Sequence, residues 1–281
     1  YRGHAHGGQR GGAVRSFAGR RVTIVGLARE GTALARFLAR QGAVVTVTDR
    51  QSAEALAENV AALAEWPIRF VLGEHPLELL ETDVVFVSPG VPLEIPFLVE
   101  ARRRGVPLSS ETRLFVELCP APIVGITGSS GKTTTTTLVG EMLRASGQKT
   151  WVGGNIGRPL IEHLPEIAPT DWVVMELSSF QLEFFAPWAG EEGRGISPAI
   201  AAVLNISPNH LDRHPSMAAY VAAKKQILLH QRADDVAVLG FDNAEARALA
   251  GECRGEVLFF SQREVVAQGA FLRDEVVTLC L

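Results

Sequence analysis

A glycine-rich turn joins an apolar strand to a helix near the middle of the chain. Residues 123–134 read Ile-Val-Gly-Ile-Thr-Gly-Ser-Ser-Gly-Lys-Thr-Thr. In such a turn, backbone N–H groups point at phosphate oxygens, and the N-terminus of the following helix adds partial positive charge. Lys132 would neutralise the outer phosphates, and Thr133 would offer its hydroxyl to Mg²⁺. The segment therefore predicts a nucleoside triphosphate site. The predicted contacts are Gly128, Ser129, Ser130, Gly131, Lys132, Thr133, Thr134 and Thr135.

The turn departs from the phosphate-loop pattern G-x-x-x-x-G-K-[ST] at one position. The first glycine of the pattern would fall at Ile126, whereas the chain has Gly125 one place earlier. We interpret the segment as a variant loop. The alternative, a Gly/Ser turn before an ordinary helix, is less favoured because strand, turn and helix follow in the required order. The buried stripe of that helix is expected at Leu138, Val139, Met142 and Leu143.

A carboxylate ends another apolar strand, Trp172-Val-Val-Met-Glu176. A buried carboxylate is costly unless it faces a cation. If this strand lies beside the phosphate strand, Glu176 projects toward Thr133 and becomes a second oxygen ligand for Mg²⁺. The alternative is a carboxylate that only begins the next helix.

Two histidines four residues apart raise the question of a transition metal. His210 and His214 lie in the polar segment 205–214, which follows a predicted strand. Pro208 and Pro215 bracket them, and no third Cys or His ligand is near in the sequence. The pattern therefore disfavours zinc.

The first βα turn is close to a dinucleotide fingerprint. Residues 26–31 read Gly-Leu-Ala-Arg-Glu-Gly, near to G-x-G-x-x-G, and Asp49 stands where a ribose-binding carboxylate would. Ala28 replaces the middle glycine, and its methyl group would obstruct a pyrophosphate. An NAD-dependent oxidoreductase therefore stays an alternative. More generally, the strand ends at Gly26, Asp49 and 88–90 would meet at the usual ligand crevice of a parallel sheet, unless they only form turns.

Strands and helices alternate along the chain, as in α/β proteins. The first predicted domain has strands at 21–26, 44–49, 68–72, 83–87 and 106–109 and helices at 32–40 and 96–104. The second begins with the phosphate strand and continues with strands at 149–152, 172–175, 200–204, 236–239 and 257–260. We predict a Rossmann-like parallel-sheet domain followed by a central α/β domain like that of P-loop ATPases.

The segment Cys119-Pro-Ala-Pro122 is the predicted domain boundary, because two prolines in three residues fit neither helix nor strand. Residues 1–16 are rich in Gly, His and Arg and have little to bury, so we expect a disordered leader. The substrate-binding domain is then 17–119, and the nucleotide-binding domain is 120–281.

Composition narrows the function classes. The chain has 281 residues, 47% of them hydrophobic, with a net charge of −4 and a pI near 6.0. No basic stretch exceeds residues 102–104, so we expect no nucleic-acid partner. No apolar run approaches the ~18 residues of a membrane span, and we expect a cytoplasmic protein. Three widely spaced cysteines argue against a disulfide framework.

Five segments in order resemble the Mur ligases of peptidoglycan synthesis. They are the turn Gly-Ser-Ser-Gly-Lys-Thr, the segments Gly-Gly-Asn155-Ile-Gly and Glu176-Leu-Ser-Ser-Phe-Gln-Leu-Glu, the segment Asn-Ile-Ser-Pro-Asn-His210-Leu-Asp-Arg, and Tyr-Val-Ala-Ala-Lys224. The second and third are most similar to the D-glutamate-adding members. Ser130 departs from the family, in which this position is usually Asn.

The resemblance implies a chemistry and a set of residues. ATP would phosphorylate the carboxylate of UDP-N-acetylmuramoyl-L-alanine, and D-glutamate would attack the acyl phosphate. The implied catalytic residues are Lys132, Asn155, Glu176, His210 and Lys224. Thr133, Glu176, His210 and Lys224 would serve two Mg²⁺ sites, with Lys224 as a carbamate; without the resemblance, a lone lysine reads as a solvated charge. The implied substrate contacts are Arg29, Glu30, Asp49, Arg50, Ser88, Gly90, Asn155 and Ser178.

Mur ligases also have a third, C-terminal domain that closes over the site. We expect that domain to be absent here, so the chain, expected to be a monomer, should bind substrates but turn over poorly. Other Mur or folylpolyglutamate-type ligases stay open as alternatives, as does a nucleotide-binding module without catalysis.

Overall fold

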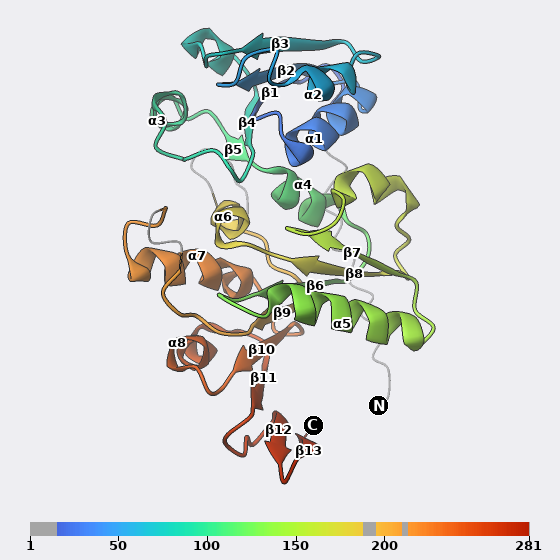
Figure 1. Ribbon diagram of the computed structural model, residues 1–281, viewed down its shortest axis with the longest axis vertical. Coiled ribbons are helices and arrows are strands. Elements are labelled where there is room, and N and C mark those ends of the chain that lie inside the picture. Colours follow the sequence, from blue (N-terminus) through green and yellow to red (C-terminus); the bar gives the residue numbers. More distant parts are fainter. Residues whose placement is uncertain (1–15, 188–194, 210–212, 281) are drawn as a thin grey trace.

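The computed structural model describes residues 16–187, 195–209 and 213–280, which form two α/β units, each built on its own sheet (Figure 1). In the first unit, five parallel strands have the order β3-β2-β1-β4-β5. These strands are β1 (Arg21–Val25), β2 (Val44–Asp49), β3 (Ile68–Leu72), β4 (Val84–Val87) and β5 (Leu108–Ser109). The arrangement confirms the predicted N-terminal parallel-sheet fold.

Helices cover both faces of the first sheet, as parallel crossovers require. Helix α1 (Arg29–Arg40) buries Leu34 and Leu38 on one face, and α3 (Pro96–Arg103) buries Phe97 and Leu98 on the other. The short α2 (Ala57–Ala61) and the 3₁₀ helix η1 (Leu77–Leu80) complete this unit. The sequence prediction began the first helix too late, because Arg29 already belongs to α1.

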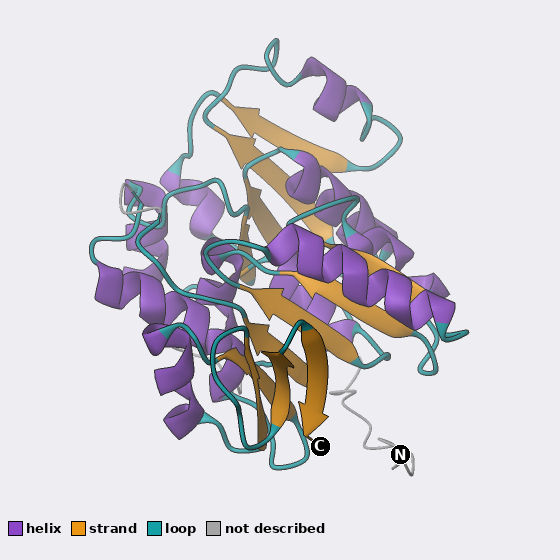
Figure 2. Cartoon of the chain, turned by 60° about the horizontal axis from the view of Figure 1, so that its bottom comes forward, coloured by secondary structure: helices purple, strands orange, loops and turns teal. Residues whose placement is uncertain are grey.

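The second sheet has eight strands in the order β13-β12-β11-β10-β9-β6-β8-β7, all parallel except for the pair β12–β13. Figure 2 shows these strands in a row, with helices on both sides. The strands are β6 (Ile123–Thr127), β7 (Thr150–Gly154), β8 (Trp172–Glu176), β9 (Ile200–Val203), β10 (Val236–Gly240), β11 (Glu256–Ser261), β12 (Gly269–Arg273) and β13 (Val276–Cys280). A tight turn with positive φ at Asp274 and Glu275 closes the last hairpin.

Helix α5 (Lys132–Ala145) lies on one face of this sheet, and α7 (Met217–Leu229) lies on the other. The predicted burial of four side chains on α5 is correct for two of them and wrong for the other two. Val139 and Leu143 pack on the sheet, but Leu138 is 57% exposed and Met142 is 69% exposed. Because α5 lies on the surface of the unit, only one side of the helix reaches the sheet. The remaining helices are α6 (Ser179–Leu182), α8 (Ala244–Ala248) and the 3₁₀ helices η2 (Leu160–Glu166), η3 (Glu183–Phe185) and η4 (Leu249–Glu252).

A helix that the sequence prediction missed, α4 (Glu111–Leu118), lies between the two units (Figure 1). Ser110 caps it by accepting a hydrogen bond from the backbone N–H of Arg113 at 3.1 Å. Its buried Leu114 and Phe115 join one apolar cluster with residues of α1 and η2. The proposed boundary at 119–122 follows this helix, and the two units share a core across it.

Most predicted strand bounds lie within two residues of those observed. The largest difference in the second unit is at β7, which runs two residues further, to Gly154. Among the helices in the described ranges, none is long and apolar enough to cross a lipid bilayer.

Candidate active site

The register of the second sheet brings the ends of β6, β7 and β8 together. In this register Glu176 pairs with Ile126 of β6 and with Gly154 of β7. Gly154 has φ +93°, and a Cβ atom there would lie 2.3 Å from the carbonyl oxygen of Glu176. Only glycine therefore lets the end of β7 run this close to β8.

The carboxylate of Glu176 accepts two hydrogen bonds at this edge. Thr133 Oγ1 donates to Oε2 at 2.7 Å, and Asn155 Nδ2 donates to Oε1 at 2.8 Å. The backbone N–H of Asn155 also donates to the carbonyl of Glu176 at 2.8 Å. Glu176 is 2% exposed. The predicted neighbourhood of the two strands, with Glu176 directed at Thr133, is confirmed.

The glycine-rich turn itself is short. Gly131 has φ +80° and is the N-cap of α5. The backbone N–H groups of the first turn of α5, which have no partner within the helix, follow it. The ammonium of Lys132 donates to the carbonyls of Gly128 at 3.0 Å and Ser129 at 3.3 Å. The lysine charge is therefore held over the turn. Thr134 and Thr135 follow on the first helical turn of α5.

The departure from the phosphate-loop pattern lies in the strand rather than in the turn. Gly125 and Ile126 both belong to β6. Ile126 is buried on the α5 side of the sheet. A Cβ atom at Gly125 would lie 2.5 Å from Pro198 Cγ and 3.3 Å from Ile227 of α7, so this glycine allows close packing on the opposite side. Neither residue is placed to touch a phosphate in the turn 128–131.

The segment after β9 braces the turn, and sequence reasoning did not assign it this role. Asn205 Oδ1 accepts from the N–H of Ser130 at 3.0 Å, and its Nδ2 donates to the Ser130 carbonyl at 3.2 Å. Ser129 Oγ donates to the Ser207 carbonyl and lies 3.1 Å from the Tyr220 hydroxyl. The signal was a polar run directly after a buried strand, which could have identified Asn205 as a brace.

Lys224 is buried at the base of the turn. It is 1% exposed, and its ammonium donates to the Gly128 carbonyl at 2.9 Å and to Thr127 Oγ1 at 3.2 Å. Burial, together with the charge of Lys132, lowers the pKa of Lys224 to about 7. The solvated-charge interpretation is therefore wrong. A lysine with this pKa has a large fraction of neutral, nucleophilic amine near neutral pH.

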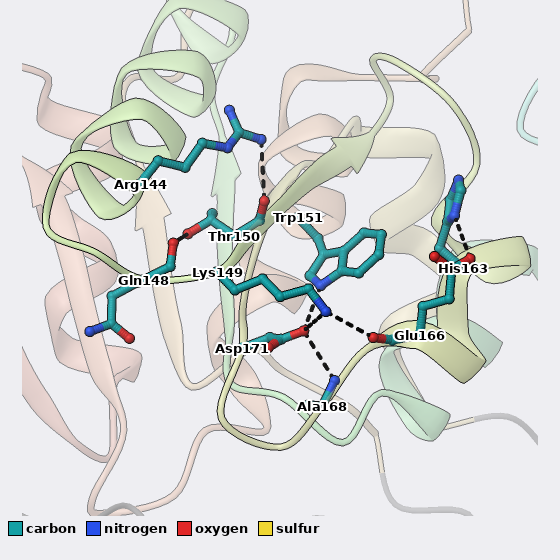
Figure 3. A network of polar contacts seen from close by, with 9 residues as sticks. All are labelled: Arg144, Gln148, Lys149, Thr150, Trp151, His163, Glu166, Ala168 and Asp171. Atoms are coloured by element: carbon teal, nitrogen blue, oxygen red, sulfur yellow. Dashed lines mark hydrogen bonds and ion pairs between the residues drawn. The ribbon is translucent and has the colours of Figure 1, made fainter.

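A polar network fixes the opposite ends of β7 and β8 (Figure 3). Trp151 Nε1 donates to Asp171 Oδ2 at 2.8 Å, and Lys149 lies 3.1 Å from the same oxygen. The bond from Trp151 lowers the pKa of Asp171, and Lys149 lowers it further. Lys149 also donates to the Glu166 carbonyl and lies over the Trp151 ring. The network ties together the two strands whose far ends carry Asn155 and Glu176.

In the N-terminal unit, the predicted crevice residues mostly hold its backbone. Asp49 Oδ2 accepts from the N–H of Leu27 at 2.7 Å, and Oδ1 accepts from Gln51 at 2.9 Å. Ser88 Oγ donates to the Gly26 carbonyl at 2.9 Å. These bonds fix the turn after β1. Arg50 and Gly90 are exposed at the same edge of the sheet.

Arg29 and Glu30 point to different surroundings. Arg29 is exposed and donates to the Gly157 carbonyl of the second unit at 2.7 Å. Glu30 turns toward α4 and α6, where Gln181 Nε2 donates to its Oε1 at 3.3 Å. Burial raises the pKa of Glu30 to about 7 and that of the buried Glu111 to about 8, and the charge of Glu30 contributes to the latter. The pair forms an acidic cluster between the units.

The remaining residues singled out from the sequence are Ser178, His210 and His214. Ser178 caps α6 in a reciprocal pair with Gln181. His210 lies outside the described residues. His214 is buried, with Nε2 at 2.9 Å from Ser179 Oγ and its ring stacked on Phe180.

The oxygen donors at the turn suit Mg²⁺. A hydroxyl and a carboxylate, Thr133 and Glu176, already lie in contact, and Mg²⁺ prefers such oxygen ligands beside nucleotide phosphates. Within the described ranges, no group of three or more His, Cys, Asp and Glu side chains could hold a metal by itself.

Two family models match the chain. The Mur ligase middle domain matches residues 126–275, and the Mur ligase MurD-like N-terminal domain matches residues 20–110. The chain belongs to the Mur ligase family. The order of the two matches is that of the two sheets.

Curated relatives of this Mur ligase chain are named UDP-N-acetylmuramoylalanine–D-glutamate ligase. One from Symbiobacterium thermophilum is 46% identical over 258 residues, which cover 91% of this chain and 55% of that protein. Another, from Acetivibrio thermocellus, is 43% identical over 258 residues, which cover 92% and 53%. The chain therefore spans about half the length of the curated relatives it matches.

A solved structure agrees with the fold of this Mur ligase chain. The UDP-N-acetylmuramate:L-alanyl-gamma-D-glutamyl-meso-diaminopimelate ligase from Neisseria meningitides superposes with a TM-score of 0.59 at 18% identity, covering 93% of this chain and 85% of that one. With the family established, the NAD-dependent oxidoreductase alternative loses its support, since the near-fingerprint at 26–31 belongs to a matched Mur ligase domain.

Proposed function

We propose that this chain is the ATP- and UDP-substrate-binding part of an ATP-dependent amide ligase of peptidoglycan precursor synthesis. The ligase would join D-glutamate to UDP-N-acetylmuramoyl-L-alanine. The names of relatives that are 40% to 46% identical support the substrates. The observation that carries the proposal is the contact of Glu176 with both Thr133 and Asn155 beside the phosphate turn.

The reaction proceeds in two steps. A carboxylate oxygen of the UDP substrate attacks the γ-phosphorus of ATP, so that ADP leaves and an acyl phosphate forms. The amine of D-glutamate then attacks the acyl carbon, inorganic phosphate leaves, and the nitrogen loses a proton. The difficulty of the first step is electrostatic, because an anion must approach a charged phosphate. Lys132 and the N–H groups at the start of α5 would offset that charge.

Thr133 and Glu176 would hold one Mg²⁺, and His210 and Lys224 would serve a second. The bound ion neutralises phosphate charge. Asn155, fixed on Glu176, would present its remaining polar groups to phosphate or substrate oxygens. The neutral amine of Lys224 would attack CO₂ and lose a proton, which converts the buried amine into a carbamate anion. The lowered pKa supports this step.

The UDP portion would lie at the edge of the first sheet, beside Arg29, Glu30, Asp49, Arg50, Ser88 and Gly90. From there, the sugar could follow a small pocket between the units. Pro89 and Glu94 line one side of this pocket, and Phe180 and Arg213 line the other. Ser178 lies on the adjoining turn. Residues of both units therefore line one surface beside the proposed UDP site.

We also infer a cytoplasmic monomer that binds neither nucleic acid nor membranes. The net charge of −4 supports the absence of a polyanionic partner.

Thermal-shift titration of the chain tests the proposal. UDP-N-acetylmuramoyl-L-alanine and Mg²⁺ with a non-hydrolysable ATP analogue should each stabilise it, by about 2.7 kcal/mol at 100 times the dissociation constant. Lys132→Ala should remove the effect of the nucleotide and keep that of the UDP substrate. Equal stabilisation by UDP-N-acetylmuramate, which lacks the alanine, would favour another Mur ligase. Stabilisation by NAD instead would contradict the proposal.

A further inference from the structure

Arg29 connects the two units by a hydrogen bond from the start of α1 to the loop after β7. It is the first residue of α1, directly after the turn that follows β1. Its Nη1 donates to the carbonyl of Gly157 at 2.7 Å, across 128 residues of sequence. This bond reaches the loop that leaves β7, on which Asn155 stands.

The loop at the far end of this bond is held on the phosphate site. The backbone N–H of Asn155 donates to the Glu176 carbonyl, and its side chain donates to the Glu176 carboxylate. The same carboxylate accepts from Thr133. A continuous series of contacts therefore runs from Arg29 to the first turn of α5.

The turn after β1, which directly precedes Arg29, is held by hydrogen bonds. Asp49 holds the N–H of Leu27, and Ser88 holds the carbonyl of Gly26. The following residue, Glu30, is turned inward to Gln181. With the backbone fixed on both sides, the exposed Arg29 side chain is the part that can respond to a ligand in the crevice.

A guanidinium suits this position because it has five N–H donors in a rigid fork. In the described part of the chain, one hydrogen bond from Arg29 is seen, to Gly157. The remaining donors can take phosphate oxygens in a bidentate arrangement, which an ammonium cannot. A diphosphate at the turn would thus fix the guanidinium, and with it the Gly157 end of the loop.

We propose that Arg29 is a positioning residue that couples a nucleoside diphosphate group bound at the first sheet to the alignment of Asn155 and Glu176 at the ATP site. This proposal rests on the proposed function. Each ligand then binds more tightly when the other is present, because the first has already ordered the shared loop.

Arg36 provides a matched control. It lies on the same helix and also crosses between the units, through an ion pair with Glu162. Within its own unit it donates to the Ala62 carbonyl. Its partners do not include the loop 155–157. Arg36→Gln therefore removes an inter-unit contact without breaking the path to Asn155.

The experiment measures the affinity of the chain for Mg²⁺ and a non-hydrolysable ATP analogue by calorimetry, with and without UDP-N-acetylmuramoyl-L-alanine. We expect about five-fold tighter nucleotide binding with the UDP substrate, at the low end of typical coupling. Arg29→Gln should abolish the enhancement of nucleotide binding, and Arg29→Lys should remove most of it. Arg36→Gln should retain the full enhancement. Hydrogen exchange of segment 153–159 should slow on addition of the UDP substrate in all but the Arg29 variants.

Three outcomes would overturn the inference: enhancement that survives in Arg29→Gln, enhancement lost equally in Arg36→Gln, or independent binding of the two ligands to the unsubstituted chain. Failure of the chain to bind either ligand alone would instead contradict the proposed function, and the inference would fall with it.

Discussion

The hydroxyl of Thr133 lies 2.7 Å from the carboxylate of Glu176, although 43 residues separate them in the chain. The contact joins the start of α5 to the end of β8. It requires β8 to lie beside β6, although β7 comes between them in the sequence, and this is the strand order observed. The relationship places a hydroxyl and a carboxylate where the proposed Mg²⁺ would meet the phosphates.

Glu176→Gln should weaken magnesium-dependent nucleotide binding. The substitution keeps the size of the side chain and removes the charge. We expect roughly ten-fold weaker binding of the Mg²⁺–nucleotide complex, or ~1.4 kcal/mol, as measured by calorimetry. Glu141→Gln on the exposed side of α5 is the control and should bind as the unsubstituted chain does. Equal affinity of the Glu176 variant would contradict the proposed ligand role.

Gly154→Ala should destabilise the fold more than a comparable glycine substitution. Gly154 and Gly147 both have positive φ, but a Cβ atom at Gly154 would lie 2.3 Å from a carbonyl oxygen, whereas none would meet an atom within 4 Å at Gly147. Both substitutions cost ~1–2 kcal/mol for the backbone conformation. Chemical denaturation should show a further loss for Gly154→Ala alone. Equal losses would show that β7 can move away from β8.

Stability should fall as pH rises from about 5 to about 8. The pKa of Glu30 is raised from 4.5 to about 7 and that of Glu111 to about 8, mainly by burial. Above the ordinary pKa, the unfolded chain loses these protons while the folded chain keeps them, so the free energy of unfolding decreases until both folded groups ionise. Arg29 partly opposes the shifts. We expect a loss on the order of 6 kcal/mol across this range.

Glu111→Gln should reduce that pH dependence and stabilise the chain at pH 8 relative to the unsubstituted protein. It removes one proton-binding carboxyl and the repulsion on Glu30. Glu58→Gln, on the exposed surface of α2, serves as the control. Denaturation at pH 5, 6.5 and 8 gives the comparison, and parallel curves for Glu111→Gln and the unsubstituted chain would argue against an ionising pair at the interface.

Lys224 should take up CO₂ reversibly. With its pKa lowered to about 7, the neutral amine is well populated at pH 7.5. ¹³C-labelled bicarbonate should give one protein-bound carbamate resonance that disappears in Lys224→Ala. The resonance should weaken below pH 6, where the amine is protonated. Lys225→Ala, whose lysine pairs with Glu252 at the surface, should keep the signal.

The sequence predicted the parallel strands up to β11 and the phosphate turn because both depend on local patterns; it did not predict the bounds of the strands β12 and β13. Apolar runs bounded by Gly and Pro identify buried strands, and the turn has a fixed order of small residues before Lys132. The adjacency of Glu176 and Thr133 could be stated only as a condition, since strand order depends on long-range pairing. The burial of Lys224 could not be predicted either, because a single lysine on a helix gives no periodic pattern in the sequence.

Other features depended on what the folded chain places nearby. Asp49 matches a ribose-binding position in sequence, but its oxygens accept backbone N–H groups of the turn. Leu138 and Met142 were expected to be buried, yet α5 has a sheet on one side only. Helix α4 was missed because its eight residues contain buried charged groups, Glu111 and Arg113, which resemble a surface segment in sequence.

The burial of α4 between the sheets bears on how this chain can be divided for experiments. Leu114 and Phe115 are covered jointly by residues of α1 and η2. A cut at Pro120 would leave α4 in the N-terminal fragment, where it keeps its contacts with α1 but loses those with η2. In the C-terminal fragment, the apolar side chains of η2 that pack on α4 would become exposed to solvent. The two family models match separate segments, but one apolar core stabilises both, so a fragment meant to stay folded should include both units.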